Sequence, residues 1–181
     1  MRALRRVLLL LLVLLAVAAS VVVLVTRPDL EAARDEVDRR WDAIAPALDE
    51  RYVRLAAAAD AARGTPGPAA ALVEELDAAL GEWRSARDGA GVAAQVGAAN
   101  DLEGLARRFD AVAAASPRLS ADAEVGAALG AFRGAAPPEG VASFDDAVRA
   151  YQAERDGPVQ GLVAAVLGHG EIPELALPAS A

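Results

Sequence analysis

The sequence predicts an all-α protein: an N-terminal transmembrane helix followed by an antiparallel four-helix-bundle-like domain with a long, kinked first helix. Three observations predict this. An uncharged apolar run covers Val7–Val25, apolar residues then recur every three or four positions, and no stretch shows the alternation typical of a half-buried strand. Proline- and glycine-rich breaks divide the chain into a membrane anchor at 1–27, a helical bundle at 28–168 and a flexible C-terminal tail at 169–181.

The apolar run is the clearest single feature. Ser20 is its only polar side chain. As a helix rising about 1.5 Å per residue, the run is roughly 28 Å long, close to the hydrocarbon thickness of a bilayer. A cleavable signal would also explain the leading arginines and the small residues Ala16–Ala18. However, Val21–Val25 continues the apolar stretch where such a signal should turn polar, so an uncleaved single-pass anchor in the cell membrane is favoured.

Arginines close to the run bear on its orientation. Arg2, Arg5 and Arg6 precede it, which favours a cytoplasmic amino terminus and an external bundle. Arg27 and Arg34 on the other flank weaken this contrast, so the side on which the bundle lies stays open.

A long helix is predicted next, at 29–62. Acidic residues follow Pro28, as the positive end of a helix prefers. Pro46 should bend this helix, because it removes one backbone donor. The apolar residues of one face recur at helical spacing: Leu30, Val37, Trp41, Ile44, Leu48, Tyr52 and Leu55.

Shorter helices are predicted after the loop at 64–68. The second contains Leu72, Leu76, Leu80 and Trp83, and the third runs from Val92 to Ala115. Ser116–Pro117 ends the third helix, and Pro137–Pro138 separates a fourth from a fifth that begins near Val141. A last amphipathic piece is predicted at 159–167. Short connections between these helices favour antiparallel neighbours.

Composition excludes several classes of function. The net charge is −8, and it is −11 once the three arginines before residue 7 are set aside. Such a surface repels nucleic acid, so no nucleic-acid partner is expected. The chain has no cysteine, which excludes disulfides and thiolate chemistry.

Catalytic and metal-binding patterns are also missing from the sequence. A di-iron bundle needs Glu-x-x-His pairs, but the only histidine is His169 and Val166 stands three positions before it. Adjacent acidic pairs such as Glu74–Glu75 point about 100° apart on a helix and do not converge on one atom. We therefore expect no enzyme activity, no metal and no cofactor.

Two segments resemble the LemA family of bacterial membrane proteins. Residues 37–52 resemble the first long helix of that family, with its pattern W-x-x-I-x-x-x-L-x-x-R-Y. Residues 144–152, followed by Leu162–Ala164, are similar to its later segment Y-N-x-A-V-x-x-Y-N and closing N-L-V-A. Ser116–Leu119 also resembles a family link between helices.

The resemblance implies a single membrane helix and an antiparallel four-helix bundle, without catalytic residues to transfer. It also places the small amino terminus outside the cell, opposite to the orientation that the arginines favour. The chain departs from the family pattern at Asp145 and Gln152, where relatives carry asparagine, and at Pro137–Pro138, where relatives have a continuous helix.

These features together predict a non-enzymatic scaffold or adaptor at the bacterial cell envelope, anchored in the lipid bilayer through Val7–Val25 and binding other envelope proteins. A homo-oligomer is compatible with this interpretation. The alternatives are an envelope-associated accessory hydrolase and a ligand-sensing bundle. The candidate residues for an interaction face or a polar network inside the bundle are Trp41, Arg51, Tyr52, Asp146 and Tyr151.

Overall fold

The computed structural model describes residues 2–65, 67–135, 137–157 and 160–177, with side chains from Arg27 onward except that of Pro68. This part of the chain is all-helical and contains no strand, which confirms the predicted fold class. The helices are α1 (Arg2–Ala61), α2 (Pro68–Gly89), α3 (Val92–Ala115), α4 (Pro117–Ala121), α5 (Ala123–Arg133), α6 (Val141–Arg155) and α7 (Gln160–Leu167).

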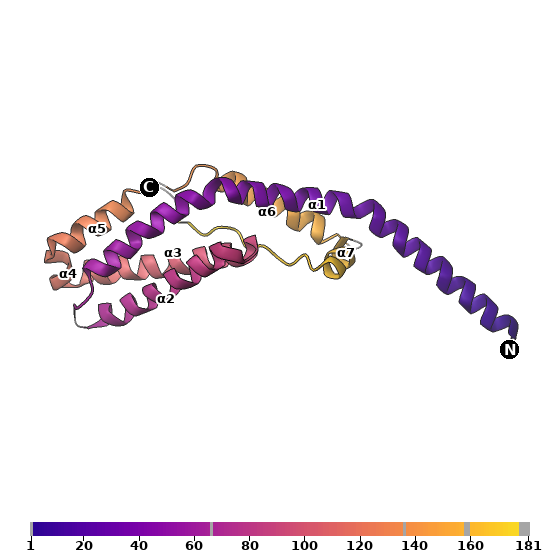
Figure 1. Ribbon diagram of the computed structural model, residues 1–181, viewed down its shortest axis with the longest axis horizontal. Helices are drawn as coiled ribbons and strands as arrows, with labels where there is room; N and C mark the ends of the chain where they lie inside the picture. Colours follow the sequence, from indigo (N-terminus) through magenta and orange to yellow (C-terminus); the bar gives the residue numbers. More distant parts are fainter. Residues whose placement is uncertain (1, 66, 136, 158–159, 178–181) are drawn as a thin grey trace.

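Helix α1 is continuous and extends beyond the other helices at its amino-terminal end (Figure 1). No break separates the predicted anchor at 1–27 from the helix predicted at 29–62, and Pro28 lies inside α1. An internal proline removes only one backbone donor and bends a helix more readily than it ends one. Among the residues searched for a membrane span, no helix is long and apolar enough to cross a bilayer. The predicted span at 7–25 lies outside the residues whose side chains are described.

The stripe predicted on α1 forms the centre of the core. Its seven residues, from Leu30 to Leu55, are each at most 2% exposed. Helix α1 also bends where it passes over the bundle (Figure 1), and Pro46 is the one proline between residues 29 and 61. On either side of Pro46 the partners change in part. Helix α6 contacts Trp41 and helix α5 contacts Arg51, whereas α2 contacts both Trp41 and Tyr52.

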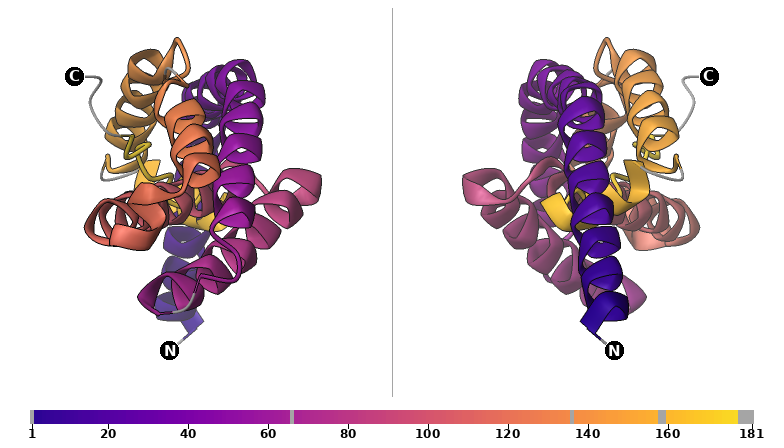
Figure 2. Two further views of the ribbon diagram at one scale, coloured as in Figure 1. Left: turned by 90° about the vertical axis from the view of Figure 1, so that its left-hand side faces the viewer. Right: turned by 90° about the vertical axis from the view of Figure 1, so that its right-hand side faces the viewer.

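Helices α2 and α3 form a hairpin that packs against α1, and α5 and α6 follow one another along α1 on another side (Figures 1 and 2). Helix α3 begins and ends at the predicted residues. Side-chain caps mark the turns around α4: Ser116 Oγ accepts from the Leu119 amide, and Asp122 Oδ1 accepts from the amides of Glu124 and Val125.

The connection between α5 and α6 runs close to α1. Gly140 has a φ of 98°, a left-handed conformation that residues with a side chain rarely adopt. A Cβ atom built on Gly140 would lie 3.3 Å from Cγ2 of Ile44 on α1. The connection therefore needs glycine for its backbone conformation and for its close approach to α1.

Residues 169–181 were expected to form a flexible tail, and the described part of this segment differs from that expectation. After α7, residues 168–177 run without helix past α3 and α6 (Figure 1). Ile172 is fully buried and Leu175 is 5% exposed. Two apolar anchors, together with polar side chains that bind the backbone, hold this segment in place. Residues 178–181 lie outside the described part of the chain.

Candidate functional site

Four of the five candidate residues lie inside the bundle. Trp41, Tyr52 and Tyr151 are at most 2% exposed, and Arg51 is 7% exposed. Asp146 is instead on the outer surface of α6, where it pairs with Arg149 one turn away at 2.5 Å. Arg51 and Asp146, two of the candidates for one interaction face or polar network, therefore have different partners.

The partner of Arg51 is Glu103 on α3, a residue that is 1% exposed. Nε of Arg51 donates to Oε1 of Glu103 at 2.7 Å, and Nη2 donates to Oε2 at 3.1 Å. Nη1 donates to the carbonyl oxygen of Ala135 at 3.0 Å, just beyond α5. The guanidinium carbon also lies 4.2 Å from the ring centre of Phe132. One side chain thus joins α1, α3 and the end of α5, using the planar fork that suits arginine to buried carboxylates.

A second polar chain links α1, α2 and α3. Nε1 of Trp41 donates to Oε1 of Gln95 at 2.7 Å, and Nη1 of Arg87 donates to the same oxygen at 2.9 Å. Nε of Arg87 also donates to Oδ2 of Asp49 at 3.3 Å. The other carboxylate oxygen of Asp49 accepts from Nε1 of Trp83 at 2.9 Å. Buried indole N–H groups need such partners, so these residues hold the tryptophans in fixed positions.

Tyr52 is likewise engaged inside the bundle. Its hydroxyl donates to the carbonyl oxygen of Ala99 at 3.2 Å. Burial raises the pKa of the phenol well above its usual range, and the carboxylates of Glu103 and Asp49 act in the same direction. The phenol therefore serves as a neutral hydrogen-bond donor. Within the described residues, every buried side-chain nitrogen or oxygen has a hydrogen-bond partner.

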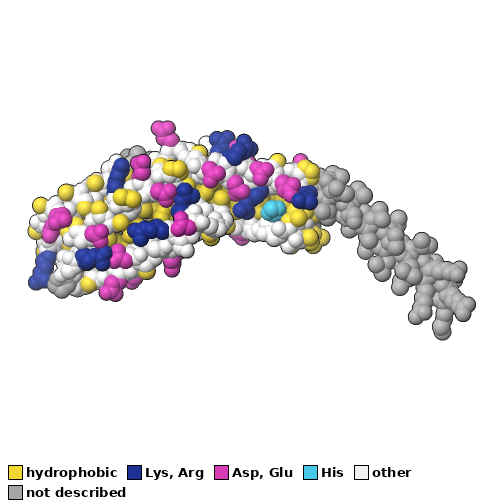
Figure 3. Space-filling view, in the orientation of Figure 1, with side chains coloured by type: hydrophobic (Ala, Val, Ile, Leu, Met, Phe, Trp, Pro, Cys, Tyr) yellow, Lys and Arg dark blue, Asp and Glu magenta, His cyan; other side chains and the backbone are white. Residues whose placement is uncertain are grey.

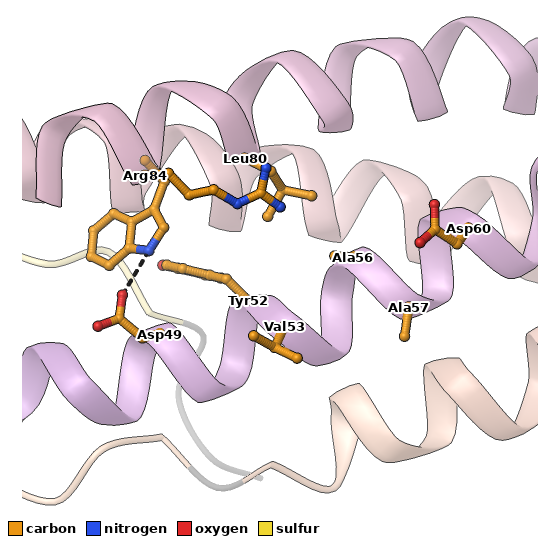
Figure 4. Close-up of a pocket in the computed structure, with 9 residues that line it drawn as sticks. Asp49, Tyr52, Val53, Ala56, Ala57, Asp60, Leu80 and Arg84 are labelled. Carbon is orange, nitrogen blue, oxygen red and sulfur yellow. Dashed lines mark hydrogen bonds between the residues drawn. The ribbon is translucent and has the colours of Figure 1, made fainter. Parts of the chain in front are cut away.

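An open hollow of about 440 Å³ lies between α1 and α2 (Figure 4). Tyr52 and Leu80 form its inner wall, while Val53 on the α1 side is 69% exposed. Asp49 and Arg84 also line it. The hollow is open to solvent and has both polar and apolar lining residues.

A second surface feature is a channel between α3 and α6, filled by residues 168–177; we call these residues the strap. Asn100 on α3 contacts the strap twice: its Nδ2 donates to the carbonyl oxygen of Glu174 at 2.9 Å, and its Oδ1 accepts from the amide of Ala176 at 2.7 Å. From α6, Nε2 of Gln152 donates to the carbonyl oxygen of Ile172 at 2.7 Å, and the Tyr151 hydroxyl donates to that of Gly170 at 2.9 Å.

Asp145 completes the channel by accepting from the amide of Leu175 at 3.0 Å. Its pKa is raised above the ordinary aspartate value, chiefly because burial disfavours the charged form. Glu174 and Asp146 raise the pKa further, whereas the Leu175 amide and Arg149 oppose the shift. This carboxylate is half-buried beside the strap and contacts its backbone.

His169, at the start of the strap, lies on the surface (cyan in Figure 3). It borders a shallow hollow with Glu31, Arg34, Asp35 and Asp38 of α1. Within the described residues, no group of three or more histidine, aspartate or glutamate side chains is arranged to hold a metal ion.

No family model, curated protein or solved structure matches this chain. The resemblance to the LemA family therefore stays a prediction that rests on the two sequence segments.

Sequence reasoning missed Gln95, Asn100 and Glu103, all on α3. Gln95 and Glu103 are buried on the face of α3 that also carries Val96, Ala99 and Leu102. A polar residue within an apolar helical stripe is a signal of a buried partner, and that signal was available in the sequence. No comparable signal marks Asn100, because its ligand is the backbone of a segment more than 70 residues away.

Proposed function

We propose that this protein is a non-enzymatic protein-interaction module, a scaffold or adaptor that a single helix at Val7–Val25 anchors in the membrane of the cell envelope. The observation that carries the proposal is the α3/α6 channel. It holds an extended polypeptide segment through side chains directed at the main chain of that segment. A surface built in this way suits recognition of another polypeptide.

The anchor supports the envelope location. The uncharged run at 7–25 belongs to the same helix, α1, as the core stripe of the bundle. An apolar stretch of this length is favourable in lipid and unfavourable in water. In the four-helix interpretation, α5 and α6 together form the fourth member of the bundle beside α1, α2 and α3. The LemA-like segments also support this interpretation.

Membrane attachment is tested by washing membranes at alkaline pH and following the full chain by immunoblot. We expect it to stay with the membrane pellet, whereas a chain that begins at Arg27 should be released. Recovery of the intact full chain in the supernatant would refute the anchor. A reporter fused after residue 177 separately reports the side on which the bundle lies.

The interaction role is tested by photo-crosslinking in cells from Arg107, at the rim of the channel, with Glu82 on the exposed face of α2 as the matched control position. We expect discrete crosslinked products from position 107 and none from position 82. Equal patterns from the two positions, or no product from either, would contradict a role for this face.

A ligand-sensing bundle is the second candidate, and the hollow between α1 and α2 favours it. Its volume of about 440 Å³ falls in the range of small-molecule sites. Val53→Trp would fill the hollow from its exposed edge. A compound whose thermal stabilisation of the full chain disappears in this variant would support the sensor. Within the described residues, no observation favours the accessory hydrolase.

A further inference from the structure

The contacts of the strap are directed mainly at its backbone. Asn100, Gln152, Tyr151 and Asp145 together bind carbonyl oxygens of residues 170, 172 and 174 and amides of residues 175 and 176. Arg107 adds a bond from its Nη1 to the carbonyl oxygen of Ala176 at 3.3 Å. Backbone groups are the same in every peptide, so these contacts are available to any segment of matching shape.

Two apolar side chains of the strap fix its register. Ile172 is fully buried and Leu175, three residues later, is 5% exposed, and both belong to the main core cluster. Pro173 stands between them. Its missing N–H leaves no hydrogen bond unmade, because the amides that the channel binds are those of residues 175 and 176. The channel therefore fits an extended segment that carries Ile-x-x-Leu and tolerates proline after the isoleucine.

Two arginines on the rim of the channel pair with glutamates of the strap. Nη1 of Arg149 lies 3.2 Å from Oε2 of Glu174, and Nη2 of Arg155 lies 3.9 Å from Oε2 of Glu171. Arg149 also pairs with Asp146, and Arg155 with Asp156, so the rim of the channel carries charges of both signs. Exposed pairs of this kind contribute little affinity, so the rim contacts two strap glutamates without setting the charge of the segment.

The strap is joined to the bundle through α7, by a turn in which Gly168 has a φ of 71°. Tethering gives a segment an effective concentration in the millimolar range for short linkers, so the strap competes strongly with a free segment. The turn also allows the strap to leave without unfolding α7, because its left-handed residue is already a glycine.

We propose that the α3/α6 channel is a peptide-binding site for an extended segment of another protein with the pattern Ile-x-x-Leu, and that the strap occupies it as an intramolecular competitor. This inference rests on the proposed protein-interaction function and names its ligand. Release of the strap is then the step that makes the channel available to the partner.

The test uses the full chain in detergent micelles and a fluorescent peptide, HGEIPELAL, which copies residues 169–177. Two strap-free forms are compared with the native chain: a chain ending at Gly168, and the full chain with I172D and L175D. Both forms must keep the helical circular dichroism of the native chain, and the second form serves if the first does not fold. We expect the strap-free chain to bind the peptide at least ten-fold more tightly than the native chain.

Two controls assign the binding to the channel. In the strap-free chain, Asn100→Ala removes two backbone contacts and should weaken binding about ten-fold. Arg108→Ala is the control, because Arg108 is on α3 but pairs with Glu75 of α2 rather than with the strap. This variant should leave peptide binding unchanged. A peptide with serine at the positions of Ile172 and Leu175 should not bind.

Three outcomes would overturn the inference. They are equal binding of the serine peptide, absence of peptide binding to a folded strap-free chain, and dimers of the native chain that disappear when the strap is removed. The last would make a second copy the occupant of the channel. If the peptide-binding test fails but position 107 gives specific crosslinks, this ligand is rejected and the proposed interaction function stands.

Discussion

Arg51 and Glu103 form a two-point ion pair in the interior of the bundle, with Nε–Oε1 and Nη2–Oε2 distances of 2.7 and 3.1 Å. The two residues are 52 positions apart in the chain and lie on α1 and α3. Taking both charges out of water is costly, and the pair is tolerated because each group faces a matched partner. This reasoning makes the pair a sensitive point for stability.

Replacing one member of the pair should destabilise the bundle strongly. Glu103→Ala leaves the guanidinium buried without its counter-charge, and we expect a loss of about 3–5 kcal/mol in the free energy of unfolding. The measurement is urea-induced loss of helical circular dichroism of the full chain in micelles. Arg108→Ala, which breaks the exposed pair with Glu75, should cost less than about 1 kcal/mol.

The double variant Arg51→Met with Glu103→Leu separates the pair from its surroundings. We expect it to be more stable than either single alanine variant, because neither charge is left alone. It should still fall short of the native chain, since Arg51 also satisfies the carbonyl oxygen of Ala135. If the double variant loses as much stability as the two single variants combined, the ion pair is not the source of the sensitivity.

The raised pKa of Tyr52 predicts that the free energy of unfolding falls at alkaline pH. Its pKa is raised in the folded state, so above pH 10 the unfolded chain releases a proton that the folded chain retains. The stabilising contribution is complete below the ordinary tyrosine pKa and is lost as the pH rises from there. We expect steeply falling stability above pH 10, measured by circular dichroism alongside tyrosinate absorbance. Tyr52→Phe should flatten this fall, although it removes the bond to Ala99; an unchanged slope would contradict the assignment.

The core face of α1 and the extent of α3 could be predicted from the sequence, because their apolar residues recur at helical spacing. The stripe from Leu30 to Leu55 was placed correctly, as were the bounds of α3. Polar pairing could not be predicted in the same way. Spacing orients residues on one helix but does not say which helix will face it, so the sequence names Arg51 as a candidate without naming Glu103 as its partner.

The strap escaped prediction for a different reason. Residues 168–177 have proline, two glycines and no helical period, which are the marks of a loose terminus. Its order comes from elsewhere, through Asn100, Gln152 and Asp145 binding its backbone. Side chains that bind a distant backbone leave no pattern in the segment that they hold.

Asp145 should report whether the strap is docked. Its pKa is raised mainly by burial, so we expect it to fall toward the ordinary aspartate value in the chain ending at Gly168, where both the cover and Glu174 are gone. The carboxyl carbon signal in an NMR pH titration measures this directly. In the full chain, Glu174→Gln should lower the pKa by removing a like charge, whereas Arg149→Ala should raise it. An unchanged pKa after truncation would mean that the strap is not the source of the burial.

The sign of this shift also fixes a pH dependence. Because the folded chain holds the Asp145 proton more tightly than the unfolded chain, this group favours the folded state at acidic pH and loses that contribution as the pH rises through its folded pKa. Arg149, Asp146 and Glu174 are the charged groups that act on it. We therefore expect the strap to protect its own amides from hydrogen exchange more strongly just below the pKa of Asp145 than above it.

Two glycine-to-alanine substitutions should change stability in opposite directions. At Gly140 the backbone is left-handed and a new Cβ would lie 3.3 Å from Ile44, so alanine should cost about 1–2 kcal/mol or more. At Gly104, inside α3, a new Cβ meets nothing within 4 Å, so alanine should stabilise by about 0.5–1 kcal/mol through its higher helix propensity. Urea unfolding of the two variants beside the native chain measures both effects. Stabilisation by Gly140→Ala would mean that the connection between α5 and α6 relaxes away from α1, and the close approach that this loop makes to the bent helix would then not be required for folding.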